Sequence, residues 1–120
     1  MFSHVTVGSN DIARAKAFYD GVTKPLGLVR HADYPEAFGY GPPGVRPLDK
    51  QAASVGNGVT VGLEAATRGA VDVAYAAAIK AGGKDEGAPG LRPHYHANYY
   101  GAYVRDLDGT KVCIVCHKAP

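Results

Sequence analysis

Residues 59–62 read Val-Thr-Val-Gly, and residues 5–8 read the same. Apolar and polar residues alternate in both runs, which is the pattern of a β-strand with one buried face. A candidate helix follows each copy, and each helix has a tyrosine at the matching place, Tyr19 and Tyr75. An internal repeat of this kind indicates two similar units that pack together to bury their apolar faces.

The 120 residues are therefore predicted to form one domain made of two modules, at about 1–55 and about 56–120. Each module reads as a strand, a helix and about three further strands, so the predicted fold class is α+β with two βαβββ modules. Glycine and proline residues predict a loop after Gly83, and Asp108-Gly109 predicts a hairpin turn. The predicted strands are residues 2–8, 28–34, 37–40, 48–54, 59–62, 96–105 and 111–117.

Capping residues and apolar spacing define the two helices. Ser-Asn-Asp at residues 9–11 offers N-caps to the first helix, and Thr67 offers one to the second. Proline and glycine at residues 25–27 end the first helix, and Gly82-Gly83 ends the second. The predicted buried faces are Ile12, Ala15, Phe18, Tyr19 and Val22 in the first helix and Val71, Ala74, Tyr75 and Ala78 in the second.

The strands are predicted to have one apolar and one polar face. The apolar set on the last two strands is Tyr100, Ala102, Val104, Val112, Ile114 and Cys116. The opposite set, with its counterpart on the first strand, is His4, Thr6, Tyr99, Tyr103, Cys113 and His117. A face of histidine, tyrosine, threonine and cysteine is a poor hydrophobic core, so it indicates a polar-lined cavity that takes a small molecule.

Composition and charge exclude several classes of partner. The net charge is +2 and the basic residues are scattered, so no nucleic-acid partner is expected. No apolar run approaches the roughly 18 residues of a membrane helix, and the N-terminus has no leader pattern, so no membrane partner is expected either. Cys113 and Cys116 lie in a strand pattern that points them to opposite faces. Two separated thiols favour a cytoplasmic protein.

Several short motifs follow one another in a characteristic order. They are His-Val-Thr-Val-Gly at 4–8, Ala-Phe-Tyr at 17–19, Gly-Asn-Gly at 56–58, the segment 90–101 and Arg-Asp-Leu-Asp-Gly at 105–109. With these motifs the chain resembles the vicinal oxygen chelate superfamily of glyoxalase I, bleomycin-resistance proteins and extradiol dioxygenases, and looks like one of its small bacterial members. The resemblance implies two βαβββ modules in a cupped mixed sheet with helices outside, usually in a homodimer. It also implies a divalent metal that chelates vicinal oxygens of a small substrate.

The resemblance implies metal ligands on the first strand of each module and on the last strand. These positions hold His4, Thr60 and Cys113 in this sequence. A threonine hydroxyl is a poor ligand for the usual divalent ions, so loss of the metal is predicted. Alternatively, His4 and Cys113 would hold zinc if further ligands came from His94, His96 or His117.

Two functions remain open from the sequence. The first is a glyoxalase-like enzyme, a lyase or isomerase acting on a small oxygenated molecule, with His4 as its general base. The alternative is a non-catalytic protein of the bleomycin-resistance type that binds and sequesters a small molecule. Arg46 and Arg92 are candidate partners of an anionic substrate, whereas Lys111 is expected to be solvated. The candidate substrate-binding residues are Tyr40, Thr60, His96, Tyr99, Tyr103 and Cys113.

Overall fold

The computed structural model describes residues 7–35, 37–40, 55–56 and 58–120. Its helices are α1 (Ile12–Thr23), the 3₁₀ turn η1 (Lys24–Leu26) and α2 (Arg68–Lys80). Its strands are β1 (Arg30–Tyr34), β2 (Ala37–Tyr40), β3 (Thr60–Glu64), β4 (Lys84–Leu91), β5 (Tyr100–Arg105) and β6 (Lys111–Cys116). The predicted strand at 48–54 lies outside the described residues, as does most of the one at 2–8.

The second half of the chain forms one βαβββ module, in the order β3, α2, β4, β5 and β6. Its four-stranded sheet has the order β3-β6-β5-β4, with β3 parallel to β6 and the other pairs antiparallel. The first half contributes α1 and the antiparallel hairpin β1–β2. The α+β class and the module of the second half are therefore confirmed, whereas the two-module cupped sheet stays a prediction.

Both helices begin and end where the sequence predicts. The Asp11 side chain accepts a hydrogen bond from the backbone N–H of Arg14, and Thr67 accepts one from Ala70. These caps satisfy N–H groups that the first helical turn leaves without partners. Gly27 ends the first helical segment with φ of 73°, which glycine adopts without the steric cost of a Cβ.

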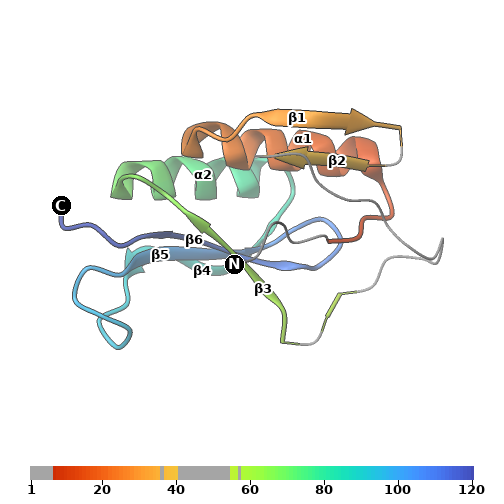
Figure 1. Ribbon diagram of the computed structural model, residues 1–120. Helices are drawn as coiled ribbons and strands as arrows, with labels where there is room; N and C mark the ends of the chain where they lie inside the picture. Colours follow the sequence, from red (N-terminus) through yellow and green to blue (C-terminus); the bar gives the residue numbers. More distant parts are fainter. Residues whose placement is uncertain (1–6, 36, 41–54, 57) are drawn as a thin grey trace.

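The hydrophobic core lies between the helices and one face of the sheet. Figure 1 shows α1 and α2 on the same side of the sheet, with the β1–β2 hairpin on α1. The fully buried members of the core are Phe18, Val22, Val71, Ala74, Ala78, Ala102, Val104, Val112 and Ile114, together with Ala65 and Cys116 at about 1% exposure. The predicted apolar faces of both helices and of the last two strands are thus confirmed, with Ile12, Tyr19, Tyr75 and Tyr100 only half buried.

Two predictions about the segment after α2 are wrong. Residues 84–91, expected as a loop, form β4, and residues 96–99, expected as strand, belong to a loop. The strand forms despite its glycines and Pro89 because it lies at the edge of the sheet, where a missing donor is tolerated. Irregularities in its pairing with β5 on both sides of Gly87 absorb the remaining misfit.

The predicted hairpin turn between β5 and β6 is confirmed, with Gly109 at φ of 93°. Asp106 organises it, because its Oδ1 accepts from the backbone N–H groups of Asp108 (3.0 Å) and Thr110 (2.8 Å). Its Oδ2 accepts from the Tyr19 hydroxyl of α1 at 2.6 Å. One carboxylate therefore closes the turn and fastens α1 to the sheet. No helix among the described residues is both long and apolar enough to cross a membrane.

Candidate functional site

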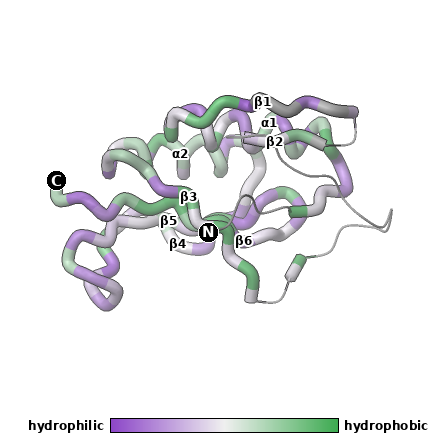
Figure 2. The backbone as a smooth tube through the Cα atoms, in the orientation of Figure 1, coloured by the Kyte–Doolittle hydropathy of each residue, from purple (hydrophilic) through white to green (hydrophobic). Residues whose placement is uncertain are grey.

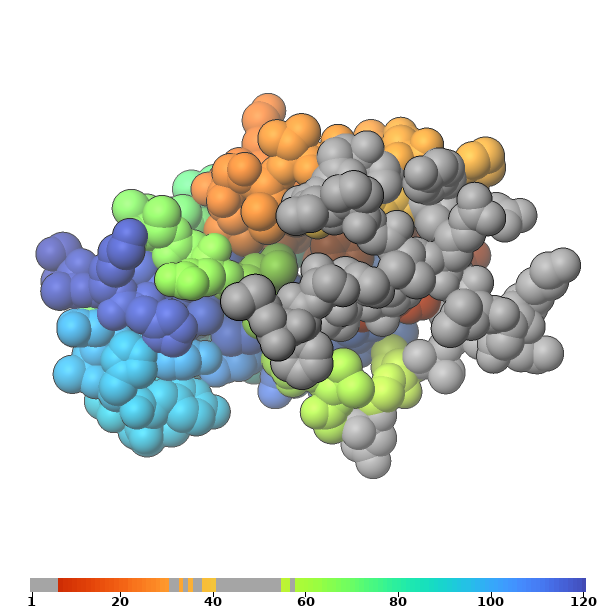
Figure 3. Space-filling model, in the orientation of Figure 1, coloured from red at the N-terminus to blue at the C-terminus, as the bar shows by residue number. Residues whose placement is uncertain are grey.

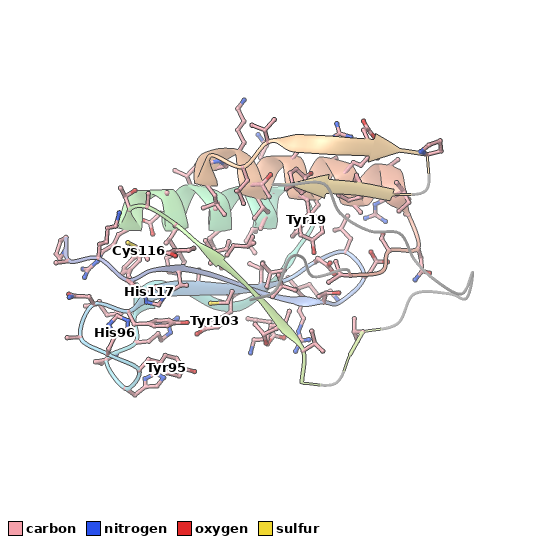
Figure 4. The ribbon with its side chains drawn as sticks, in the orientation of Figure 1. Tyr19, Tyr95, His96, Tyr103, Cys116 and His117 are labelled. Carbon is pink, nitrogen blue, oxygen red and sulfur yellow. The ribbon has the colours of Figure 1, made fainter. Side chains whose placement is uncertain are left out.

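The face of the sheet away from the helices carries the side chains predicted to line a cavity. Tyr103 of β5 is in register with Cys113 of β6, and Cys113 with Gly62 of β3. Both cysteines are free and buried, but Cys116 belongs to the core under the helices. Figure 4 shows Cys116 and Tyr19 on the helix side of the sheet and Tyr103 on the other side. The predicted separation of the two thiols is confirmed.

Aromatic rings gather on this side around the loop 92–99 between β4 and β5. Successive ring centroids lie 4.3 Å apart for His94 and Tyr95, 4.8 Å for Tyr95 and Tyr99, and 5.6 Å for His96 and Tyr99. The loop projects beside the C-terminal residues in Figure 3 and is largely hydrophilic in Figure 2. We call this group the aromatic cluster; its members are His94, Tyr95, His96, Tyr99, Tyr103 and His117.

The hydroxyl of Tyr99 lies at the centre of the cluster. It is 3.1 Å from the Tyr103 hydroxyl and 3.4 Å from Cys113 Sγ, both within hydrogen-bond distance. Burial raises the pKa of Tyr99 well above its usual range, and the hydrogen bonds to Cys113 and Tyr103 raise it further. Burial also raises the pKa of Tyr103. Both phenols are therefore neutral at physiological pH, where they donate hydrogen bonds and do not act as bases.

A pair of histidines fastens the loop to the end of β6. His96 Nε2 lies 2.8 Å from His117 Nδ1, and His96 Nδ1 accepts from the Asn98 backbone N–H at 3.2 Å. Since His96 Nδ1 is an acceptor, the hydrogen of its neutral ring is on Nε2 and points at His117. His96 thus lies beside Tyr99, with ring centroids 5.6 Å apart, and reaches it from a loop; its role in substrate binding stays a prediction.

Two glycines under the rings were not singled out by the sequence analysis. A Cβ at Gly101 would lie 2.9 Å from Tyr99 Cε1, and one at Gly87 would lie 3.3 Å from Tyr103 Cδ2. A Cβ atom essentially never lies within 2.9 Å of a heavy atom beyond its own residue and chain neighbours. Only glycine at position 101 therefore lets the Tyr99 ring pack on β5. The available signal was glycine inside a strand, which often marks close approach of another group.

Two of the three positions where the family resemblance implies metal ligands, Thr60 and Cys113, are on the paired strands β3 and β6. Thr60 is exposed at the start of β3, directly opposite Lys111, and Cys113 Sγ is engaged by the Tyr99 hydroxyl. A neutral threonine hydroxyl is a poor ligand for the usual divalent ions. Among the residues that the structure describes, there is no group of three or more His, Cys, Asp or Glu side chains that could hold a metal ion. His4, the third position, lies outside them.

The expectation that Lys111 is solvated is wrong. Its side chain is half buried, and Nζ lies 5.1 Å from the centre of the Tyr103 ring. The Arg92 guanidinium is 5.9 Å from the same ring centre. Both distances are within the range of cation–π contacts. Arg46, the other arginine considered for an anionic substrate, lies outside the described residues.

Tyr40 lies apart from the aromatic cluster. It is on β2, where its hydroxyl donates to Asp20 Oδ1 of α1 at 2.6 Å. Its ring packs near Tyr19 and Phe38, with centroid distances of 6.4 and 5.9 Å. The structure therefore does not bring Tyr40 together with Tyr99 and Tyr103, and its role in substrate binding stays a prediction.

Raising the pH is expected to unfold the protein and ionise Tyr19 in one step. Burial and the hydrogen bond to Asp106 raise the pKa of Tyr19 well above its usual value of about 10. The unfolded chain ionises first, so the stability contributed by Tyr19 is complete below about pH 10 and is lost as the pH rises further. Part of the phenolate absorbance should appear only together with loss of the circular dichroism signal.

The matched variant is Tyr19→Phe. It should reduce the slope of unfolding free energy against pH above pH 10 by up to about 1.4 kcal/mol per pH unit, the value for one ionising group. Full titration of all tyrosines with the native dichroism intact would contradict the burial of this hydroxyl.

Comparisons with known proteins agree with this fold. The family model of the Glyoxalase/Bleomycin resistance protein/Dioxygenase superfamily matches residues 1–114. A crystal structure of a glyoxalase/bleomycin resistance protein from Albidiferax ferrireducens T118 is similar over 98% of both chains, at 36% identity and a TM-score of 0.86. No curated protein matches the chain by sequence.

Two more distant structures show likeness of fold alone. A glyoxalase/bleomycin resistance protein/dioxygenase family enzyme from Burkholderia phytofirmans PsJN is 20% identical, with a TM-score of 0.69 over 97% of this chain and 98% of its own. A glyoxalase-related enzyme from Fulvimarina pelagi is 17% identical, with a TM-score of 0.67 over 96% and 88%. The match of the family model over nearly the whole chain is decisive. The chain belongs to the glyoxalase/bleomycin resistance protein/dioxygenase superfamily.

Proposed function

We propose that the protein binds a small, planar, oxygenated molecule at the aromatic cluster. The observation that carries this proposal is the central Tyr99. Its hydroxyl contacts the Tyr103 hydroxyl and Cys113 Sγ, and its ring contacts those of Tyr95, His96 and His117. Rings supply stacking area, and the neutral hydroxyls supply donors for a ligand oxygen. Tyr95 is 61% exposed, so a large part of this surface is open to a ligand.

Binding of this kind needs no metal, and we propose that the family's metal site is degenerate in this chain. The residues concerned are His4, Thr60 and Cys113. The support is chemical: Thr60 offers a neutral hydroxyl opposite Lys111, and Cys113 Sγ already meets Tyr99. The proposal also includes the two-module domain and the homodimer that the family resemblance implies. Light scattering of the purified protein tests the homodimer.

Catalysis on the bound molecule is the second candidate. The observation that favours it is the His96–His117 pair, whose members lie with ring centroids 5.6 and 5.4 Å from that of Tyr99. A histidine and a neutral phenol are a base and a hydrogen-bond donor, which is what a lyase or isomerase needs at a carbonyl compound. Turnover of a bound compound, lost on replacing His96 or His117 by Ala, would favour the enzyme over the binding protein.

Removing the Tyr99 hydroxyl is expected to weaken ligand binding about 2- to 13-fold. This range corresponds to the net free energy of one hydrogen bond of about 0.5–1.5 kcal/mol. The probes are catechol, phenylglyoxal, benzamide and 4-hydroxybenzamide, screened by ligand-observed NMR and measured by calorimetry with a chelator present. The variant is Tyr99→Phe.

The matched control is Tyr100→Phe, which removes a hydroxyl that donates to Asp72 of α2 and not to the aromatic cluster. It should leave the dissociation constants unchanged. Tyr40→Phe measured in parallel tests the predicted role of Tyr40. Equal affinities of wild type and Tyr99→Phe for the probes would show that the Tyr99 hydroxyl does not bind the ligand. Binding that is seen without the chelator and lost with it would overturn the metal-free proposal.

A further inference from the structure

We propose that the ligand of the aromatic cluster is an anion, a small aromatic carboxylate whose charge is held by Lys111 and Arg92. This inference rests on the proposed function and adds the chemical class of the ligand. Tyr103 is on β5, between β6, which carries Lys111, and β4, which Arg92 follows. Lys111 Nζ and the Arg92 guanidinium both lie within 6 Å of its ring centre. Two positive charges thus converge on one ring of the cluster.

Neither cation forms an ion pair with any described residue. Elsewhere in the described parts of the chain, Arg105 pairs with Glu86 at 3.0 Å, and Arg30 pairs with both Asp20 and Asp33. Within the described segments, the partners of these two half-buried side chains are the Tyr103 ring and, for Arg92, backbone carbonyls. A partly desolvated charge without a counterion is unfavourable, so an anion bound next to these two cations, at the Tyr103 ring, would be stabilised strongly.

Arg92 is held in place by its surroundings before any ligand binds. Its Nη2 donates to the Ala88 carbonyl at 2.8 Å and its Nη1 to the Leu91 carbonyl at 3.2 Å. The guanidinium folds back along β4 so closely that a Cβ at Gly90 would lie 2.9 Å from Nη1. A guanidinium has five N–H donors, and these contacts use two of them. The remaining donors are available to a carboxylate, and little side-chain entropy is left to lose on binding.

Lys111 also explains why a threonine is tolerated where the family has a metal ligand. The register of the parallel pair places Thr60 directly opposite Lys111, on the face that carries Cys113 and Tyr103. An ammonium group at this place repels a divalent cation and attracts an anion. On this face, two side-chain cations that bind the carboxylate directly take the place of a metal ion. A metal ion would bind neutral or anionic oxygens of the ligand instead.

Two acidic side chains of the described sheet, Glu86 and Glu64, form no ion pair with Lys111 or Arg92. Glu86 is engaged by Arg105 Nε. Glu64 is exposed at the far end of β3, opposite Val115, four residues along the strand from the position opposite Lys111. Among the described residues, the positive charges beside Tyr103 therefore have no acidic counterion, although the net charge of the chain is only +2.

Calorimetry on matched acids and amides tests the inference. Benzoate and 4-hydroxybenzoate are expected to bind at least about tenfold more tightly than benzamide and 4-hydroxybenzamide, since one charge-assisted hydrogen bond contributes about 1.5–3 kcal/mol. The preference should shrink as sodium chloride screens the charges. It should fall below about threefold in Lys111→Met and Arg92→Met, while Lys111→Arg restores it.

The control for net charge is Lys80→Met, because Lys80 is exposed in the last turn of α2, on the other side of the molecule from the cluster. It should keep the full preference for the acids. Circular dichroism shows that each variant is folded. Equal affinity of acids and amides in wild type would overturn the anion inference but leave the proposed function standing. A preference that survives in both methionine variants would overturn the assignment of Lys111 and Arg92. If neither acids nor amides bind, the proposed function fails as well.

Discussion

Phe18→Ala is expected to lower the free energy of unfolding by about 3–5 kcal/mol, the usual cost of truncating a fully buried phenylalanine. Phe18 is 0% exposed and is the largest fully buried side chain of the core. Its ring meets Tyr19 edge-on at 5.1 Å and packs so closely on Gly83 that a Cβ there would lie 2.8 Å from Cε2. The loss is a large part of the total free energy of unfolding of a small domain, which is about 5–15 kcal/mol.

Urea denaturation followed by circular dichroism measures this loss. Val73→Ala on α2 is the matched control, since Val73 is 57% exposed and surface substitutions change stability by about 0.5 kcal/mol or less. A loss below about 1 kcal/mol for Phe18→Ala would show that α1 is not packed on the sheet as described.

Asp106→Ala is expected to cost about 3 kcal/mol, the second largest effect. The carboxylate is 5% exposed and accepts from Tyr19 of α1 and from the backbone of Asp108 and Thr110. Removing it leaves these donors without an acceptor in a largely buried place, which costs more than the hydrogen bonds themselves contribute. The same denaturation experiment measures the loss.

A double-mutant cycle separates the two tasks of Asp106. Tyr19→Phe should cost about 1–2 kcal/mol by removing one hydrogen bond to a charged acceptor. Combined with Asp106→Ala it should add little, because the shared interaction is already gone. Strictly additive losses would mean that the hydrogen bond between Tyr19 and Asp106 contributes nothing to holding α1 on the turn.

Local sequence patterns were sufficient to predict the helices, the buried faces and the last turn. Thr67 and Asp11 cap helices because side-chain oxygens accept from the first turn wherever the helix later packs. Gly109 and Asp108 form a turn for equally local reasons. Alternation along β5 and β6 was enough to separate Cys113 from Cys116, because successive strand side chains point to opposite faces.

What the sequence did not predict depends on contacts between distant segments. β4 reads as a loop because its glycines and Pro89 disfavour strands, and only its place at the sheet edge makes them acceptable. Lys111 reads as a solvated lysine because nothing local shows that Tyr103 will lie beside it. The convergence of Lys111 and Arg92 follows from the pairing of three strands, which no run of residues in the sequence expresses.

The hydrogen bond between His96 and His117 has a consequence for how the loop 92–99 moves. It joins the loop to the residue that follows β6, so opening the loop requires that this bond break or that the tail move with it. Both rings are exposed, so water replaces either partner at little cost in free energy when the bond breaks. The loop and the tail after β6 are therefore expected to become flexible together, although 20 residues separate the two histidines in the chain.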